Sequence, residues 1–214
     1  MYPMTDHPRP DGLRDTYDRI AEDWARDHEG DTWWRDGAEK FASLLPPGAR
    51  VLDAGCGSGQ KARFFQDRGV HVLGIDFSAK LLDLARQTAP ASDFRLLDLR
   101  DIRTLPEEFE GVFAQASLLH IPKAEIVSVI DGMVSRLVPR GLLYIAVKGQ
   151  RPGGPQEEIV TERDYGYAYD RFFSYYTLDE IRAHVARAGL SVVHAEASQS
   201  ASKADWIQVI ARKS

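Results

Sequence analysis

The sequence predicts a single α/β domain built around a doubly wound, largely parallel β-sheet. Three observations predict this fold class. Short apolar, β-prone runs alternate with helical patterns from Arg50 to Val147, as they do in consecutive strand–helix–strand units. A glycine-rich turn follows the first of these runs, at residues 55–59. The length of 214 residues suits one sizeable core with an appendage better than two full domains.

Two helical patterns precede the first expected strand. Apolar residues recur at helical spacing over residues 13–24, and a shorter pattern covers residues 38–45. The Pro-Pro-Gly sequence at residues 46–48 then ends helical structure. Residues 1–48 are therefore expected to form a helical appendage, and residues 49–214 the core of the domain.

The core continues as a regular alternation of strands and helices. Strands are expected at residues 50–54, 70–75, 94–97, 111–115, 142–147, 191–197 and 206–211, with helices at 60–68, 78–87, 123–137 and 177–188. The connection between the last two strands is too short for a crossover helix, so they should pair antiparallel. This gives seven strands with the last one antiparallel and helices on both faces. A polar insert at residues 149–172 interrupts the order and is expected to be a loop over the carboxyl edge of the sheet.

The turn after the first strand has the composition of a ligand-binding loop. Gly55, Gly57 and Gly59 are spaced G-x-G-x-G, and Gln60 stands where a dinucleotide-binding loop has its third glycine. Glycines let a ligand lie against the backbone, since a side chain would fill its space. Asp53, two residues before the loop, suits a ligand end that carries an ammonium group. The spacing therefore disfavours a nicotinamide dinucleotide.

Two further aspartates end the next two strands. Asp76 follows Gly55 by about 20 residues, the separation at which an acid binds ribose hydroxyls. Asp98 ends the third strand and could accept a hydrogen bond from an adenine amino group. An aspartate at such a position can also be a helix cap, but three acids at one sheet edge favour an adenosine-type ligand.

The segments VLDAGCGSG, GIDFS, FRLLDLRDI, VFAQASLLHIP and LVPRGLLYIAV, in this order and spacing, resemble the class I S-adenosylmethionine-dependent methyltransferases over about residues 51–148. The resemblance implies a Rossmann-like seven-stranded sheet, S-adenosylmethionine as cofactor, and a helical lid at residues 1–48. It also implies these cofactor contacts: Gly55 and Gly57 at the methionine part, Asp76 at the ribose, Asp98 and Leu99 at the adenine edge, Phe77 on the adenine face, Asp53 in support of the loop, and Cys56, Gln115 and Tyr17 around them.

The acceptor side is less clearly marked in the sequence. His120 follows the fourth strand and is the candidate catalytic base, although a hydrogen-bonded structural histidine fits the same position. Trp34, His120 and Tyr175 are the candidate acceptor-binding residues, and the aromatic residues near the end of the insert could equally anchor the insert. Lys148 is expected to cap the end of a strand. No metal site is expected.

Composition narrows the class of partner. The net charge of −5 gives no electrostatic reason to expect nucleic acid. The longest apolar runs are too short for a membrane span, and residues 1–12 are rich in proline and charge, so we expect a cytoplasmic protein. The resulting hypothesis is methyl transfer to an O, N or S nucleophile of a small-molecule acceptor by a monomer or homodimer. A non-catalytic cofactor-binding protein and a nicotinamide oxidoreductase are the alternatives.

Overall fold

The fold is taken from a computed structural model that describes residues 12–198 and 205–214. Its α-helices are α1 (Leu13–Asp27), α2 (Arg35–Ser43), α3 (Gln60–Gln66), α4 (Ala79–Thr88), α5 (Lys123–Ser135) and α6 (Leu178–Arg187). Its strands are β1 (Arg50–Ala54), β2 (His71–Asp76), β3 (Asp93–Leu96), β4 (Phe109–Gln115), β5 (Leu137–Lys148), β6 (Glu157–Glu162), β7 (Tyr169–Ser174), β8 (Leu190–Ser198) and β9 (Trp206–Lys213). Two short 3-10 helices are η1 (Leu99–Thr104) and η2 (Leu118–His120).

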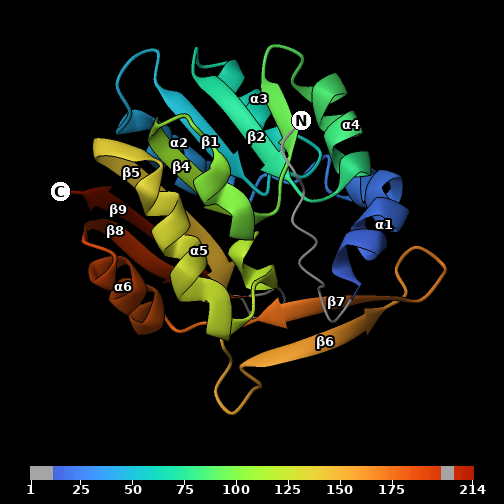
Figure 1. Cartoon of the computed structure of the whole chain (residues 1–214). Coiled ribbons are helices and arrows are strands. Elements are labelled where there is room, and N and C mark those ends of the chain that lie inside the picture. Colours follow the sequence, from blue (N-terminus) through green and yellow to red (C-terminus); the bar gives the residue numbers. More distant parts are fainter. Residues whose placement is uncertain (1–11, 199–204) are drawn as a thin grey trace.

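The main sheet has seven strands in the order β3-β2-β1-β4-β5-β9-β8 (Figure 1). The pairs from β3 to β5 are parallel, and β9 runs antiparallel to both of its neighbours. The predicted doubly wound, seven-stranded sheet with its last strand antiparallel is confirmed. Because the chain builds outward from β1 to β3 and then returns to β4, the strand order reverses between β1 and β4. That crevice is where an open α/β sheet binds its ligand.

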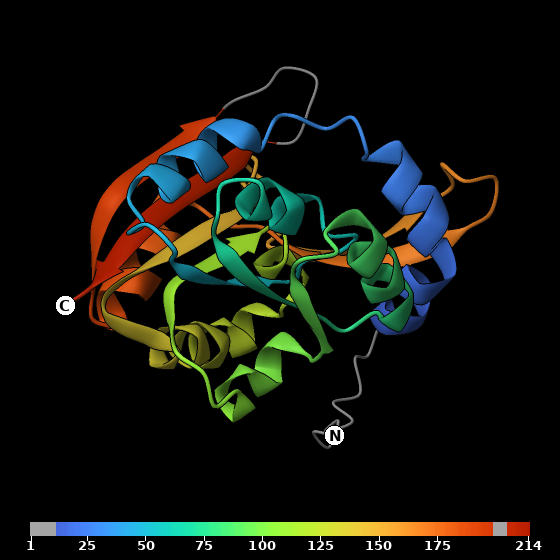
Figure 2. The same cartoon turned by 90° about the horizontal axis from the view of Figure 1, so that it is seen from above.

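Helices cover both faces of the sheet, and each face has its own core. Figure 2 shows α2 and α3 on one face and α5 and α6 on the other. Ile130 of α5 and Val185 of α6 are fully buried in the larger core. Phe41 of α2 and Phe65 of α3 are fully buried in the smaller one. The alternating apolar pattern thus folds as predicted, because β1, β4 and β5 lie between two layers of helices and are buried on both sides.

The first helix, α1, lies beside the sheet and packs against α4 and β7 (Figure 1). Its apolar side chains Leu13 and Ile20 are fully buried in a third cluster with Leu81 of α4 and Tyr169 of β7. The predicted helix N-terminal to the sheet is therefore present. Residues 1–11 of the expected 1–48 appendage lie outside the described residues.

The insert differs from the sequence prediction. Residues 149–172 were expected to form a loop, but β6 and β7 pair as an antiparallel two-stranded sheet. This sheet joins the main body through an isolated bridge between Gly149 and Tyr176. The sequence of β6, Glu-Glu-Ile-Val-Thr-Glu, is mostly exposed and does not alternate between apolar and polar residues. It therefore lacks the pattern by which a strand is predicted. The insert is a hairpin that positions β7 against α1.

Candidate functional site

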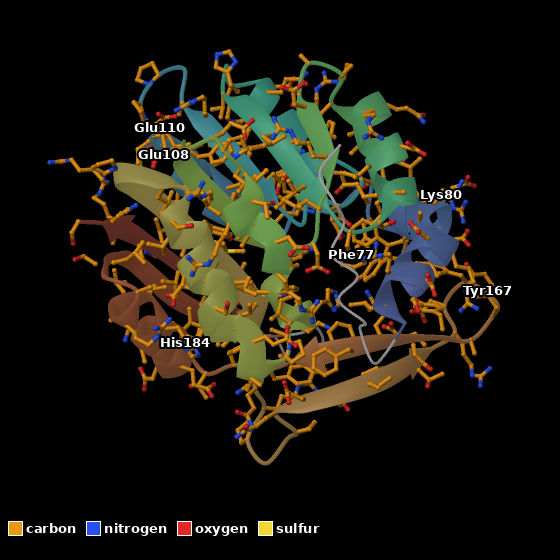
Figure 3. All side chains as sticks on the ribbon, viewed as in Figure 1. Phe77, Lys80, Glu108, Glu110, Tyr167 and His184 are labelled. Carbon is orange, nitrogen blue, oxygen red and sulfur yellow. The ribbon has the colours of Figure 1, made fainter. Side chains whose placement is uncertain are left out.

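A cavity of about 190 Å³ lies at the carboxyl ends of the parallel strands, where the strand order reverses. The glycine loop, the ends of β2, β4 and β5, and the inner faces of α1 and β7 line it. Figure 3 shows Phe77 between the end of the sheet and α1. The predicted site residues that line this cavity are Tyr17, Gly55, Cys56, Gly57, Asp76, Phe77, Leu99, Gln115 and His120.

Backbone geometry explains the glycine loop. The φ of Gly55 is +83°, and a β-carbon there would lie 2.3 Å from the Ser117 β-carbon. Any larger residue would therefore push β1 and β4 apart at the cavity. A β-carbon on Gly57 would lie 3.3 Å from the Trp24 ring of α1. The loop is thus closed on one side by β4 and on the other by the N-terminal helix.

Asp76 links the glycine loop to the end of β2. One carboxylate oxygen accepts a hydrogen bond from the Gly57 N–H at 2.9 Å, and the other accepts from the Ser78 N–H at 2.9 Å. Asp76 is buried and lines the cavity. Each carboxylate oxygen can accept more than one hydrogen bond, so these backbone contacts fix the carboxylate in place while leaving acceptor capacity toward the cavity.

Gln115 and Ser117 provide buried donors at the end of β4. Within residues 12–198 and 205–214, the Gln115 Nε2 and the Ser117 Oγ are buried and have no hydrogen-bond partner. Both side chains line the cavity. A buried donor without a partner costs free energy, and a polar ligand in the cavity would satisfy these two groups.

Asp53 lies behind the cavity wall and is not part of it. Its carboxyl is buried, and burial raises its pKa from the ordinary value to about 7. Lys61, at the start of α3, partly opposes this shift, and burial lowers the pKa of its own ammonium. Lys61 does line the cavity. Lys61 is therefore one of the charged groups that a ligand would meet, and support of the loop by Asp53 stays a prediction.

Asp98 lies at the start of η1. Its carboxylate accepts from the Arg100 N–H at 3.0 Å, and the Arg100 guanidinium lies 3.4 Å away. Asp98 therefore caps η1, while its neighbours Leu97 and Leu99 line the cavity. The contact of Asp98 with an adenine amino group stays a prediction, since the residues on either side of it line the cavity.

His120 joins three parts of the chain. Its Nδ1 lies 2.7 Å from the Phe172 carbonyl oxygen, which can only accept, so Nδ1 carries the proton in this contact. Its Nε2 lies 2.8 Å from the Tyr17 hydroxyl of α1. Burial raises the pKa of Tyr17, which keeps this hydroxyl protonated and able to donate. Arg171 of β7 donates to the same hydroxyl at 3.3 Å.

Of the two remaining acceptor candidates, neither lines this cavity. Trp34 is buried against Phe64 in the core under α2, which corrects its assignment, whereas its neighbour Trp33 does line the cavity. Tyr175 lines a second cavity of about 480 Å³ between the β6–β7 hairpin and the loop after β5. Lys148 and Phe173 line both cavities, so the two are adjacent.

Sequence reasoning missed several cationic residues at the cavity. Lys61, Lys148 and Arg171 all line it. Lys148 was expected to cap a strand, but its Nζ lies 3.7 Å from the centre of the Phe173 ring. The place of Lys148 at the carboxyl end of a parallel strand was a usable signal, since that edge carries the site. Arg171 lies in the hairpin that the sequence did not reveal.

In residues 12–198 and 205–214 there is no group of three or more His, Cys, Asp or Glu side chains that could hold a metal ion. No helix in this part of the chain is both long and apolar enough to cross a membrane.

The family comparison agrees with the site. Residues 51–141, which carry the glycine loop, Asp76 and the end of β4, match a family model described as a methyltransferase domain. Residues 51–141 therefore carry a methyltransferase domain similar to those of the S-adenosylmethionine-dependent class. The matched segment runs from β1 into the first part of β5. The hairpin and α1 lie outside it, so the methyltransferase domain model covers the cofactor side of the cavity only.

The curated proteins that the chain resembles are named for different methyl acceptors. A ubiquinone biosynthesis O-methyltransferase of Dechloromonas aromatica is 32% identical over 124 residues, which cover 56% of this chain and 50% of the relative. Phosphoethanolamine N-methyltransferase 1 of Zea mays is 28% identical over 186 residues, 84% of this chain and 35% of the relative. The chain thus spans about half the length of the ubiquinone-pathway relatives it matches.

Solved methyltransferase structures share the fold. The 1,6-didemethyltoxoflavin-N1-methyltransferase of Burkholderia thailandensis, solved with its acceptor and S-adenosylhomocysteine, has a TM-score of 0.74 at 19% identity, covering 99% of this chain and 94% of that one. Magnesium protoporphyrin IX methyltransferase of Synechocystis PCC 6803 has a TM-score of 0.69 at 22% identity, covering 98% and 100%. At these identities the likeness concerns the fold.

Proposed function

We propose that the protein uses S-adenosylmethionine to methylate an O, N or S nucleophile of a small-molecule acceptor. The observation that carries this proposal is the cavity itself, where Gly57, Asp76 and the unpartnered donors of Gln115 and Ser117 converge. A carboxylate that lines a glycine loop suits ribose hydroxyls. When bound, S-adenosylmethionine supplies an electrophilic methyl group on a sulfonium centre.

Charged side chains at one end of the cavity match an amino acid. Asp31 and Lys61 both line it, and the electrostatic attraction of Asp31 raises the pKa of Lys61 against the effect of burial. A carboxylate and an ammonium are what the methionine part of the cofactor carries, so Lys61 would hold the first and Asp31 the second. Phe77 and Leu99 supply the apolar surface expected around the adenine.

The chain's own residues would exclude water and position the acceptor. Tyr17 and Trp24 of α1 line the cavity, so α1 is proposed as the lid. His120 is proposed to hold that lid through Tyr17, since its Nε2 already accepts from the Tyr17 hydroxyl. The aromatic residues Trp33 and Phe173 favour a small, flat acceptor over a polymer.

Isothermal titration calorimetry with S-adenosylmethionine, S-adenosylhomocysteine and NAD tests the cofactor. We expect both sulfur compounds to bind in the micromolar range and NAD not to bind. Release of S-adenosylhomocysteine across a panel of small acceptors then tests transfer. Binding without transfer to any acceptor would favour a non-catalytic cofactor-binding protein, and binding of NAD alone would favour an oxidoreductase.

A further inference from the structure

Lys148 stands at the boundary between the two cavities. It is the last residue of β5 and pairs with Trp206 at the start of β9, which also lines the first cavity. Lys148 and Phe173 are the residues common to both cavity linings. A ligand that extends from one cavity into the other would therefore pass the Lys148 ammonium.

This ammonium lacks an anionic partner in the described part of the chain. Its Nζ lies over the Phe173 ring at 3.7 Å, and within residues 12–198 and 205–214 it makes no hydrogen bond or ion pair. Arg171, which also faces the first cavity, is different because its guanidinium is paired with Glu162 on the neighbouring strand, at 2.6 Å. Lys148 is thus a half-buried cation whose hydrogen-bonding capacity is unused.

The charges around Lys148 come from every element that packs near it. Burial and the positive charge of Arg171 lower the pKa of Lys148, while the carboxylates of Glu158 and Glu162 on β6 raise it. The net result is a pKa of about 8. The other titratable side chains that line the two cavities are Tyr17, His28, Asp31, Cys56, Lys61, Asp76, His120, Arg151, Tyr175 and Asp205. At this pKa, roughly a tenth of Lys148 is an uncharged amine at pH 7 and about half at pH 8.

We propose that the methyl acceptor is an aromatic compound with an acidic hydroxyl, a phenol or enol, lying across the junction of the two cavities, and that Lys148 Nζ removes the proton from this hydroxyl. The proposal rests on the methyl-transfer function proposed above. The neutral amine takes the hydroxyl proton and becomes an ammonium, which stabilises the oxyanion. The oxygen lone pair then forms the O–CH₃ bond, the electrons of the S–CH₃ bond stay on sulfur, and the ammonium returns its proton to water.

The surroundings of Lys148 select for an aromatic acceptor. Trp33 and Trp206 stack on each other with ring centres 4.2 Å apart, and both line the first cavity. Phe173 and Tyr175 stack 6.3 Å apart and continue the aromatic surface into the second cavity. Flat rings pack favourably on such surfaces. An aliphatic alcohol would gain less from these rings and has a hydroxyl too weakly acidic for an amine base.

The test measures ionisation of a bound probe and needs no turnover. 4-Nitrophenol is the probe, because its ionised form absorbs visible light and its neutral form does not. The protein is saturated with S-adenosylhomocysteine, and the absorbance of bound 4-nitrophenol is followed as pH is raised. A positive charge at contact distance favours the ionised form of a phenol. The acid ionisation constant of 4-nitrophenol bound to the wild-type protein should therefore be at least about tenfold larger than that of 4-nitrophenol in water.

Lys148→Met should abolish this increase, and Lys148→Arg, which keeps the charge, should retain part of it. Lys123→Gln is the matched control: Lys123 also lies over an aromatic ring, Tyr176 at 4.9 Å, but lines neither cavity, so the variant should behave as wild type. In acceptor assays with phenols, Lys148→Met should lower kcat more than it raises KM, and the acid limb of the pH–rate profile should disappear.

Three outcomes would overturn the proposal. One is equal ionisation of 4-nitrophenol in wild type and Lys148→Met. Another is failure of 4-nitrophenol to bind the wild type at all. The third is Lys148-dependent binding of 4-nitrobenzoate with no change in 4-nitrophenol ionisation, which would make Lys148 an anchor for carboxylates. Calorimetry with S-adenosylhomocysteine distinguishes failure of the Lys148 proposal from failure of the methyl-transfer proposal. If S-adenosylhomocysteine binds but the ionisation of 4-nitrophenol is unshifted, only the Lys148 proposal fails. If S-adenosylhomocysteine does not bind, both proposals fail.

Discussion

The Asp76 carboxylate accepts a hydrogen bond from the Gly57 N–H and also lines the cavity. We expect Asp76→Asn to weaken S-adenosylhomocysteine binding by about 10- to 100-fold, because charge-assisted hydrogen bonds to the ribose and to the loop are lost. Calorimetry measures the affinity, and thermal unfolding checks that the variant folds. Asp83→Asn, on the exposed face of α4, should bind as wild type. An unchanged affinity of Asp76→Asn would remove Asp76 from the cofactor site.

Asp53 predicts a pH dependence of stability. Its pKa in the folded protein, about 7, lies above the ordinary value of 3.8. Between these two values the folded state binds more protons than the unfolded state, so the free energy of unfolding falls as pH rises from about 4 to 7. Asp53→Asn should lose this fall, which is about 4 kcal/mol over the whole range and about 3 kcal/mol between pH 5 and pH 8. Urea unfolding of both proteins at pH 5 and pH 8, without cofactor, measures the difference. Equal pH dependences would contradict the prediction.

The chemical types of the site residues were easier to predict than the directions of their side chains. The glycine spacing and the acids at strand ends marked Gly55 and Asp76, because strand ends of a parallel sheet share one edge. The Asp98 carboxylate pairs with Arg100, and of two adjacent tryptophans Trp33 lines the cavity while Trp34 is buried at the N-cap of α2. Such choices depend on tertiary neighbours that a linear pattern does not contain.

At the scale of elements, α1 is held to the sheet domain by a specific contact. Asp18 accepts hydrogen bonds from the Ser78 hydroxyl at 2.6 Å and the Lys80 N–H at 3.1 Å, at the start of α4. If α1 is the lid, Asp18→Ala should weaken S-adenosylhomocysteine binding by about 10- to 100-fold, since a hydrogen bond to a charged group contributes about 1.5 to 3 kcal/mol. Calorimetry is the measurement.

The control for this prediction is Asp15→Ala, also in α1 but exposed and without a contact to α4 among the described hydrogen bonds and ion pairs. It should bind the cofactor product as the wild type does. If Asp18→Ala loses stability but keeps its affinity, α1 is part of the scaffold and not a lid.

Elements of the main sheet were predictable because each is apolar on a regular period and lies between helices. The β6–β7 hairpin was missed for the opposite reason. Only part of it is buried, and the exposed Ile159 together with glutamates at both ends of β6 gives no clean alternation. Its strands are fixed by pairing with each other and by contact of β7 with η2 and α1. Those contacts are distant in sequence, so no local window reports them.

At the scale of the whole molecule, we expect methyl transfer to proceed without a metal ion. Residues 12–198 and 205–214 contain no group of three or more His, Cys, Asp or Glu side chains that could hold a metal ion, and divalent cations need several oxygens in one place. EDTA should therefore leave both turnover and S-adenosylhomocysteine affinity unchanged. Loss of turnover with EDTA and its recovery with magnesium would show that the carboxylates serve a different role.

The triad of Tyr17, His120 and Arg171 has a consequence for biosynthesis. Arg171 follows Tyr17 by 154 residues along the chain. At a translation rate of ~5–20 residues per second, the β7 partner of α1 leaves the ribosome ~8–30 s after α1 itself. During that interval the apolar face of α1, with Leu13 and Ile20, has no β7 to pack against. The nascent chain can form β1 to β5 first, so the α1 side of the cavity closes only when the hairpin reaches a helix that was made at the beginning.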